Sequence, residues 1–259
     1  MVLKLHILAQ VALWGLLAGS GLLIGAVVAV TLYGRFSHRI IAATMGFGGG
    51  VLIAVLSIQL MESAYDDGGP IAATTGFLLG ATAFSTINWR LAQNGARHRN
   101  RCGECVEQPS ETEHKGSGLA IAVGAVLDGI PESVVIGLSL LAGENIGLGL
   151  VAGFFLSNVP QGLSSASGMK KAGRSSKYIF SLWTGILLIS GMAAAAGYLL
   201  LGTANSAIPA TILAFAAGGV LAMLAESMIP EAFADAQPFT GLITVVGFLV
   251  AFLIIRIPA

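Results

Sequence analysis

The chain has 259 residues, of which 55% are hydrophobic and only 10% are charged, and its mean hydropathy is +0.85. Soluble domains carry about 25% charged residues, so this composition excludes an ordinary soluble protein and predicts an integral membrane protein. The 13 basic and 13 acidic side chains cancel, which argues against a nucleic-acid partner. The 2 cysteines are too few for a disulfide framework.

A membrane-spanning helix needs about 20 mostly apolar residues, and eight runs of the sequence meet this requirement. In chain order, we expect spans at about 7–33, 40–64, 71–91, 117–142, 146–169, 177–201, 207–233 and 239–257. Polar and glycine-containing stretches separate them, and the longest of these, 92–116, is a predicted cytoplasmic loop. The chain is therefore predicted to be a single all-α transmembrane transporter domain, 1–259.

The positions of Lys and Arg predict how the chain is oriented in the membrane. Eleven of the 13 basic residues lie in or beside the first, third and fifth connections, and only Lys4 and Arg256 fall on the other side. Because basic loops remain cytoplasmic, we expect both termini outside, in the cell (inner) membrane, with the lipid bilayer as a partner. The oligomeric state is left open, with a homodimer as one option.

An internal repeat accompanies this pattern. The stretch "GGGVLIAVLSIQLMESAYDD" at 48–67 aligns without gaps with "AGGVLAMLAESMIPEAFADA" at 217–236. This offset places spans 1–3 on spans 6–8 in the opposite orientation and leaves spans 4 and 5 as a central pair. The predicted architecture is a 3+2+3 inverted repeat, which is typical of transporters whose substrate site lies near mid-membrane.

The two central spans share a polar motif around a proline, "LDGIPES" at 127–133 and "LSNVPQG" at 156–162. Asp128 and Glu132 are four residues apart and therefore lie on one face of span 4. Ser157 and Gln161 have the same spacing in span 5, with Asn158 one residue further around the helix. Each proline lacks an amide donor and pushes away the carbonyl four residues earlier. We expect these oxygen-bearing groups to face one small volume.

Carboxylates in the middle of a membrane span need a positive charge to balance them. One charged side chain at the bilayer centre costs about 2.5–3.5 kcal/mol, and no Lys, Arg or His lies inside an expected span away from its ends. The balancing charge is therefore a proton or a bound cation. Because oxygen ligands suit hard or borderline divalent ions, we predict such a metal as the transported substrate, without a prosthetic group. The other reading is a pair of protonated carboxyls with a structural role.

These features resemble the ZIP (Zrt/Irt-like) family of divalent metal transporters. The likeness rests on the eight expected spans, the basic loop between spans 3 and 4, the proline motifs and "IPE" at 229–231. The resemblance implies an outside N-terminus and movement of spans 1, 4, 5 and 6 as one bundle against the rest. It also implies a metal site on spans 4 and 5, here Asp128, Glu132, Gln161, Ser157 and Asn158.

The ligand set departs from the family pattern. Asp128 stands where the family has a His, Ser157 replaces a stronger ligand, and Gln161 replaces a Glu, while Gly129 carries no side-chain ligand. Span 6 contains no carboxylate, so we expect one transport site rather than two. The loss of imidazole shifts the site toward oxygen and leaves zinc, manganese and iron open as the metal.

Further candidates lie away from spans 4 and 5. Glu62 and Glu231, which match in the repeat, and Glu226 lie near membrane depth and are candidates for the ion pathway, against a reading as ordinary interfacial acids. The predicted cytoplasmic loop contains side chains with metal-ligand chemistry, namely Cys102, Cys105, His98 and His114. A single C-x-x-C is a weak signal, so metal binding by this loop is one of two readings.

Two other functions were weighed. The sequence contains no H-E-x-x-H, no G-x-S-x-G and no phosphate loop. A membrane-embedded hydrolase that uses Asp128 and Glu132 is the enzyme alternative, but no nucleophile or second catalytic motif supports it, so we expect a protein that is not an enzyme. The competing transport function is a proton-coupled carrier of a small organic cation that uses the same carboxylates. Such a carrier needs an aromatic-lined cavity, and no aromatic residue occurs in 127–137 or 156–169, which favours a small ion.

Overall fold

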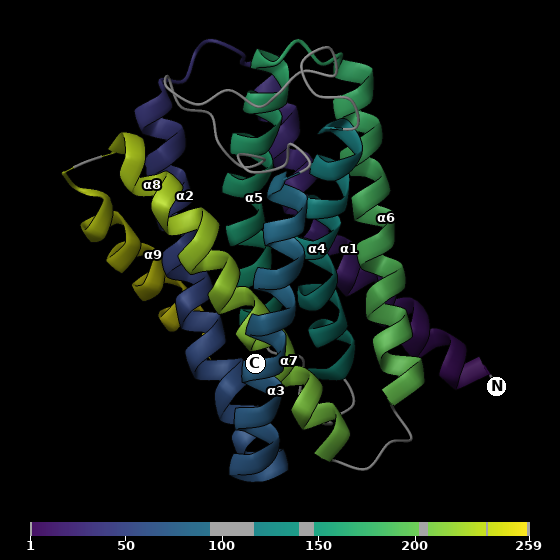
Figure 1. Cartoon of the computed structure of the whole chain (residues 1–259). Coiled ribbons are helices and arrows are strands. Elements are labelled where there is room, and N and C mark those ends of the chain that lie inside the picture. Colours follow the sequence, from purple (N-terminus) through teal and green to yellow (C-terminus); the bar gives the residue numbers. More distant parts are fainter. Residues whose placement is uncertain (1, 94–116, 140–147, 202–206, 237, 258–259) are drawn as a thin grey trace.

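The computed structural model describes residues 2–93, 117–139, 148–201, 207–236 and 238–257, and the regular elements among them are all helical (Figure 1). The α-helices are α1 Val2–Thr31, α2 His38–Val55, α3 Met61–Leu91, α4 Ser117–Ser139, α5 Leu148–Lys171, α6 Ser176–Leu201, α7 Ala207–Met223, α8 Ile229–Ala236 and α9 Thr240–Ile255. Two π-helical segments, η1 Leu56–Leu60 and η3 Leu224–Met228, join α2 to α3 and α7 to α8. The expected all-α class is confirmed.

The second and third expected spans belong to one helical stretch that contains a kink. At the kink, Gly69 has φ 71° and ψ −179°, a backbone conformation that only glycine adopts without strain. Pro70 follows and cannot donate an amide hydrogen bond. The sequence "YDDGGP", which we expected to be a loop, is therefore a bend within continuous helical structure.

Four helical stretches of the described residues are long and apolar enough to cross a membrane: His6–Thr31, His38–Leu91, Ser176–Leu201 and Ala207–Ala234. Thr240–Ile255 is a shorter apolar helix. The second stretch has 54 residues and includes the kink, whereas about 20 residues suffice for one crossing. These stretches agree with a membrane protein, and the count of eight crossings stays a prediction.

The helices pack as two groups. In the first group, α1 packs on α5 and α6, and α4 packs on α6; in the second group, α3 packs on α7, and α2 packs on α8 and α9. The main contact between the groups is that of α2 with α5. Figure 1 shows α1, α4 and α6 toward one side of the molecule and α2, α8 and α9 toward the other. We refer to these as the first and second groups below.

Within each group the helix backbones touch at glycines. A Cβ atom at Gly162 of α5 would collide with the carbonyl oxygen of Leu22 in α1, and a Cβ at Gly80 of α3 would collide with the carbonyl oxygen of Phe215 in α7. Small residues are the usual means by which helices in a membrane approach closely enough for backbone van der Waals contact. The high glycine content, 35 residues, is thus in part used for packing within the groups.

This packing makes a testable prediction. Gly80→Ala should lower the free energy of unfolding by about 1–3 kcal/mol because the added methyl group overlaps the α7 backbone. Gly185→Ala in α6 is the matched control, since a Cβ there meets nothing within 4 Å and alanine favours a helix by about 1 kcal/mol over glycine. Thermal unfolding of the purified proteins in detergent should therefore rank Gly80→Ala below the parent and Gly185→Ala at or above it; equal changes would refute the close contact.

One end of the bundle carries two basic connections. The α1–α2 and α5–α6 connections both lie at the upper end in Figure 1. Gly173, with φ 79°, ends α5. Its own amide donates to the carbonyl of Lys170 over 3.1 Å, and the amide of Arg174 donates to the carbonyl of Met169 over 3.0 Å. The basic residues in or beside these connections are Arg35, Arg39, Lys170, Lys171, Arg174 and Lys177. We refer to this end of the molecule as the basic end.

Candidate metal site

A layer of polar side chains separates two apolar clusters along α4 and α5. In α4, Ala125 belongs to one cluster and Val135 to the other; in α5, Leu163 belongs to the first and Phe154 to the second. Between these positions lie the predicted ligands Asp128, Glu132, Ser157, Asn158 and Gln161. The layer is near the middle of both helices.

All five predicted ligands are buried, with Asp128 7% exposed, Glu132 2%, Ser157 0%, Asn158 4% and Gln161 3%. Both helices continue through their prolines, Pro131 and Pro160. Residues four apart therefore still lie on one face of the helix, so Asp128 shares a face with Glu132, and Ser157 with Gln161. The prolines do not break the helices, and the loosened carbonyls expected from them stay a prediction.

Glu132 is the least satisfied polar residue of the layer. Both of its carboxylate oxygens are buried and have no hydrogen-bond partner among the described residues. The side-chain amide of Asn158 and the carboxyl group of Asp128 lie near it. Since a buried polar group without a partner costs about 1–3 kcal/mol and a charged one costs more, this carboxylate fits a residue that serves as a cation ligand.

Asn158 is held by α1. Its amide nitrogen donates a hydrogen bond of 3.1 Å to the carbonyl of Ala18, and Gly21 leaves room for it, because a Cβ at Gly21 would lie 2.9 Å from the Cβ of Asn158. With its nitrogen engaged, the amide has its oxygen available for a cation. Ser157 donates to the carbonyl of Phe154 over 2.9 Å, so its hydroxyl oxygen likewise keeps lone pairs for a cation.

Gln161 supplies a second amide to the layer. Its nitrogen is buried and, within the described residues, makes no hydrogen bond. Gly129 faces α6 rather than an open space, since a Cβ there would lie 3.9 Å from both Ile186 and Ser190. No group of three or more His, Cys, Asp or Glu side chains gathers in the described parts of the chain. The candidate site thus consists of two carboxylates with amide and hydroxyl oxygens, a set suited to hard or borderline divalent ions.

The other predicted residues lie elsewhere. Glu226 is exposed, and its carboxylate accepts hydrogen bonds from the hydroxyl of Ser85 and, at 2.7 Å, from the amide of Asn88 in α3. Glu231 is 9% exposed in α8, and Glu62 is exposed at the start of α3. Their role in a pathway stays a prediction. The loop candidates lie outside the described residues: Cys102, Cys105, His98 and His114.

The apolar helical bundle agrees with an integral membrane protein, and its buried carboxylates at mid-length mark a candidate functional site. No protein-family model matches the sequence. Three relatives are the zinc transporters ZupT of Salmonella newport (strain SL254), Salmonella heidelberg (strain SL476) and Salmonella typhimurium (strain LT2). Each is 29% identical over 224 residues, 84% of this chain and 84% of the relative. The chain is thus similar over most of its length to proteins named as zinc transporters, in agreement with the resemblance drawn from its sequence.

Proposed function

We propose that the protein carries a divalent metal cation into the cytoplasm through the polar layer of α4 and α5. Asp128 and Glu132 supply the negative charge, and Gln161, Ser157 and Asn158 supply neutral oxygens. The observation that carries this proposal is Glu132, which is 2% exposed and has no hydrogen-bond partner for either carboxylate oxygen in the described structure. The relatives are named as zinc transporters, so zinc is the first ion to test, followed by manganese and iron, which the oxygen ligands also suit.

We further propose eight membrane crossings arranged as a 3+2+3 inverted repeat. Placing the first three spans on the last three converts the α2–α9 pair into α7–α3 and the α1–α5 pair into α6–α4, and all four pairs are packed. The offset that aligns 48–67 with 217–236 also carries η1 onto 225–229, and η3 occupies Leu224–Met228, one residue away. Since π-helical segments are rare, their matching positions favour the repeat.

The same four helix pairs share a detail of packing that supports the repeat. In each pair, one glycine from either helix meets a backbone carbonyl of the other. The glycines of the four pairs, in the order α1–α5, α6–α4, α2–α9 and α7–α3, are Gly25 with Gly162, Gly197 with Gly137, Gly50 with Gly247, and Gly218 with Gly80. A two-way contact of this kind in every pair is expected if the two halves descend from one unit.

The two groups suggest how the ion crosses. The ligands on α4 and α5 belong to the first group, so movement of that group against the second would carry the complete site between the two faces, as the family resemblance implies. At Gly48 of α2, a Cβ would come 3.2 Å from the ring of Pro160 and 3.3 Å from the carbonyl oxygen of Ser157. The α2–α5 contact therefore lies beside the site, where the two groups would slide. The basic end would face the cytoplasm, with both termini outside.

The proposal is tested by uptake into vesicles that contain the purified protein. We expect zinc, manganese, iron or cadmium to enter, and each transported metal to compete with the others for one saturable site. Uptake of a small organic cation with no response to any of these metals would instead support the competing carrier. If the metals bind to the protein but do not enter the vesicles, the protein binds metal without transporting it.

Acidification should weaken uptake. A carboxylate must lose its proton to bind a metal, so protons and metal compete for Asp128 and Glu132. In the range where the carboxylates take up protons, the apparent KM should rise by up to about tenfold per pH unit for each proton displaced. Initial rates at fixed metal concentration over a pH series measure the effect, with the free metal concentration buffered at each pH. A KM that falls on acidification would contradict carboxylate ligands.

A further inference from the structure

A buried polar group lies in the π-helical segment η1, outside the polar layer of α4 and α5. It is the side chain of Gln59, in the second half of Leu56–Leu60. Its carbonyl oxygen is buried and has no hydrogen-bond partner among the described residues. An unpaired buried acceptor destabilises a fold, and π-helical segments often occur at functional sites. The position of Gln59 therefore indicates a role other than packing.

Gln59 lies on the face of the second group that packs against the first group. Val55 belongs to this face, because a Cβ atom at Gly153 of α5 would collide with its side chain. Residues four apart share a helix face, so Gln59 follows Val55 on the same side, about one turn further from the basic end. The contact between α2 and α5 thus continues from Gly48, beside the candidate site, through Val55 toward Gln59.

The proposed repeat gives Gln59 the same direction. The offset that aligns the two halves carries Gln59 onto Met228 in η3. The terminal methyl group of Met228 lies 3.4 Å from a Cβ at Gly48, and Pro160 of α5 adjoins the same point. In addition, η1 packs on α7 as η3 packs on α2. The matching position in η1 is therefore expected at the contact between the two groups.

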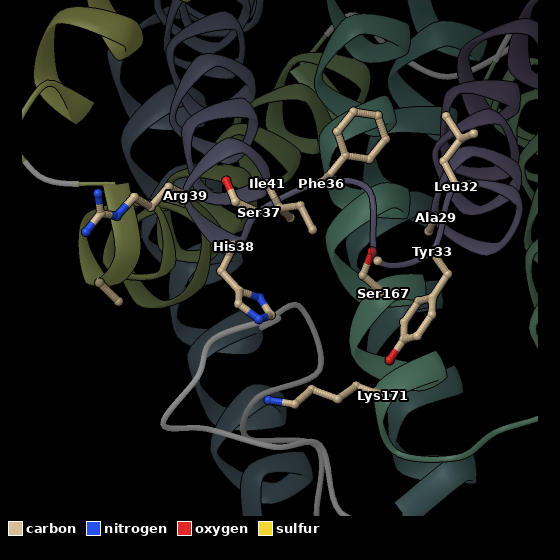
Figure 2. Close-up of a pocket in the computed structure, with 12 residues that line it drawn as sticks. Ala29, Leu32, Tyr33, Phe36, Ser37, His38, Arg39, Ile41, Ser167 and Lys171 are labelled. Carbon is tan, nitrogen blue, oxygen red and sulfur yellow. The ribbon is translucent and has the colours of Figure 1, made fainter.

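This contact is closed on one side of the candidate site and hollow on the other. Gln59 is eleven residues beyond Gly48, which is about 16 Å along a helix. The intervening Leu52 and Val55 are both 0% exposed. Toward the basic end, a pocket of about 890 Å³ lies between the first turn of α2 and the end of α5 (Figure 2). Its lining includes His38, Ile41, Ser167 and Lys171. The apolar closure therefore lies between the polar layer and Gln59.

We propose that the amide oxygen of Gln59 contacts the transported cation between the outer face and the polar layer. Amide oxygens are ordinary ligands of hard and borderline divalent ions. A ligand that meets the ion at only one stage of transport has no protein partner at the other stages, which agrees with the unpaired oxygen of Gln59. The inference rests on the proposed metal transport, and it adds a residue that helps to select the ion.

The two groups explain how Gln59 and the polar layer would act in sequence. Movement of the first group away from the basic end would carry the layer past Leu52 and Val55 toward Gln59. The ion would then be held by Glu132 from the first group and by Gln59 from the second. Gln59 would therefore affect how readily an ion enters the protein, rather than how tightly the layer binds it afterwards.

Two substitutions of Gln59 test this contact by zinc uptake into vesicles that contain the purified full chain. Gln59→Met keeps the length of the side chain and removes the oxygen, so the KM should rise by about fivefold at an unchanged maximal rate. Gln59→Glu adds a negative charge at the same place, so the KM should fall by about fivefold. A side chain that serves only in packing would not give opposite changes in the two variants.

Gln10→Met is the matched control, because Gln10 is exposed on α1 and the chemical change is the same; its KM should equal that of the parent. The Tm of Gln59→Met should equal or exceed that of the parent, since an unpaired buried oxygen is removed. Unchanged KM values in both Gln59 variants, or changes in the same direction, would overturn the contact and leave the metal site of α4 and α5 in place. No metal uptake by the parent would reject the proposed function, and the contact with it.

Discussion

Glu132→Gln should lower the rate of metal uptake by more than about a hundredfold, because removing a charge that acts on the ion at about 4 Å costs roughly 4 kcal/mol at an effective dielectric constant of 20. The substitution keeps the shape of the side chain and one neutral oxygen, so the loss would come from the charge. Uptake into vesicles at equal protein content measures it. Retained uptake would remove the α4–α5 site from the mechanism.

The same variant should also be at least as stable as the parent when no metal is present. Both carboxylate oxygens of Glu132 lack hydrogen-bond partners in the described structure, and relief of such a group is worth about 1–3 kcal/mol. This corresponds to a rise in Tm of up to about 10 °C for a protein of this size. A purely structural, hydrogen-bonded carboxyl predicts the opposite, so a lower Tm would favour the structural reading.

Glu226→Gln is the matched comparison for stability. The carboxylate of Glu226 accepts hydrogen bonds from Ser85 and Asn88 of α3, and hydrogen bonds to a charged group contribute about 1.5–3 kcal/mol. Its replacement should therefore lower the Tm. Opposite changes in Tm for the two glutamates would separate a ligand that lacks partners from an acid that holds two helices together.

Gly48→Leu should stop uptake while leaving metal binding intact. A Cβ at this position is already 3.2 Å from Pro160 and 3.3 Å from the carbonyl oxygen of Ser157, so the leucine side chain would lie between α2 and α5. If the first group slides against the second, this wedge should lower the uptake rate by about tenfold or more and change the equilibrium metal affinity by less than about threefold.

Two measurements distinguish this result from misfolding. Titration calorimetry with the metal reports the site, and vesicle uptake reports the movement. Gly185→Leu in α6 is the control, because nothing lies within 4 Å of a Cβ there, and it should retain both activities. Normal uptake by Gly48→Leu would show that the α2–α5 contact does not move during transport.

Much of the helical structure could be predicted because it depends on local composition. The expected span 177–201 corresponds to α6 Ser176–Leu201, and the expected span 207–233 corresponds to the α7–η3–α8 stretch. The prediction that "YDDGGP" forms a loop was wrong. Its charged and glycine residues favour a turn when the stretch is taken alone, but the helices on either side continue through it. Only the kink at Gly69 remains of that turn.

The candidate ligands were predictable for the same kind of reason. Asp128 and Glu132 stand out in an apolar run, and their four-residue spacing places them on one helix face without reference to the rest of the chain. The role of α1 was not predictable. Asn158 donates to the carbonyl of Ala18, 140 residues away in sequence, and a backbone carbonyl leaves no signal in a sequence pattern.

Glu226 illustrates the same limit. The sequence made it a candidate for the ion pathway, and gave no sign of its hydrogen-bond partners, Ser85 and Asn88, which are 141 and 138 residues away. Pairings of this kind depend on how the helices pack, and single-helix periodicity carries no information about them.

The sequence by itself determined that this is a helical membrane protein with two carboxylates in the middle of an apolar segment, because hydrophobicity and helical spacing are properties of neighbouring residues. Only the tertiary structure decided that the carbonyl of Ala18 in α1 holds Asn158, and which helices form the two groups. Those features come from contacts between distant residues, where glycines let backbones meet and where buried polar groups either find partners or, like Glu132 among the described residues, do not.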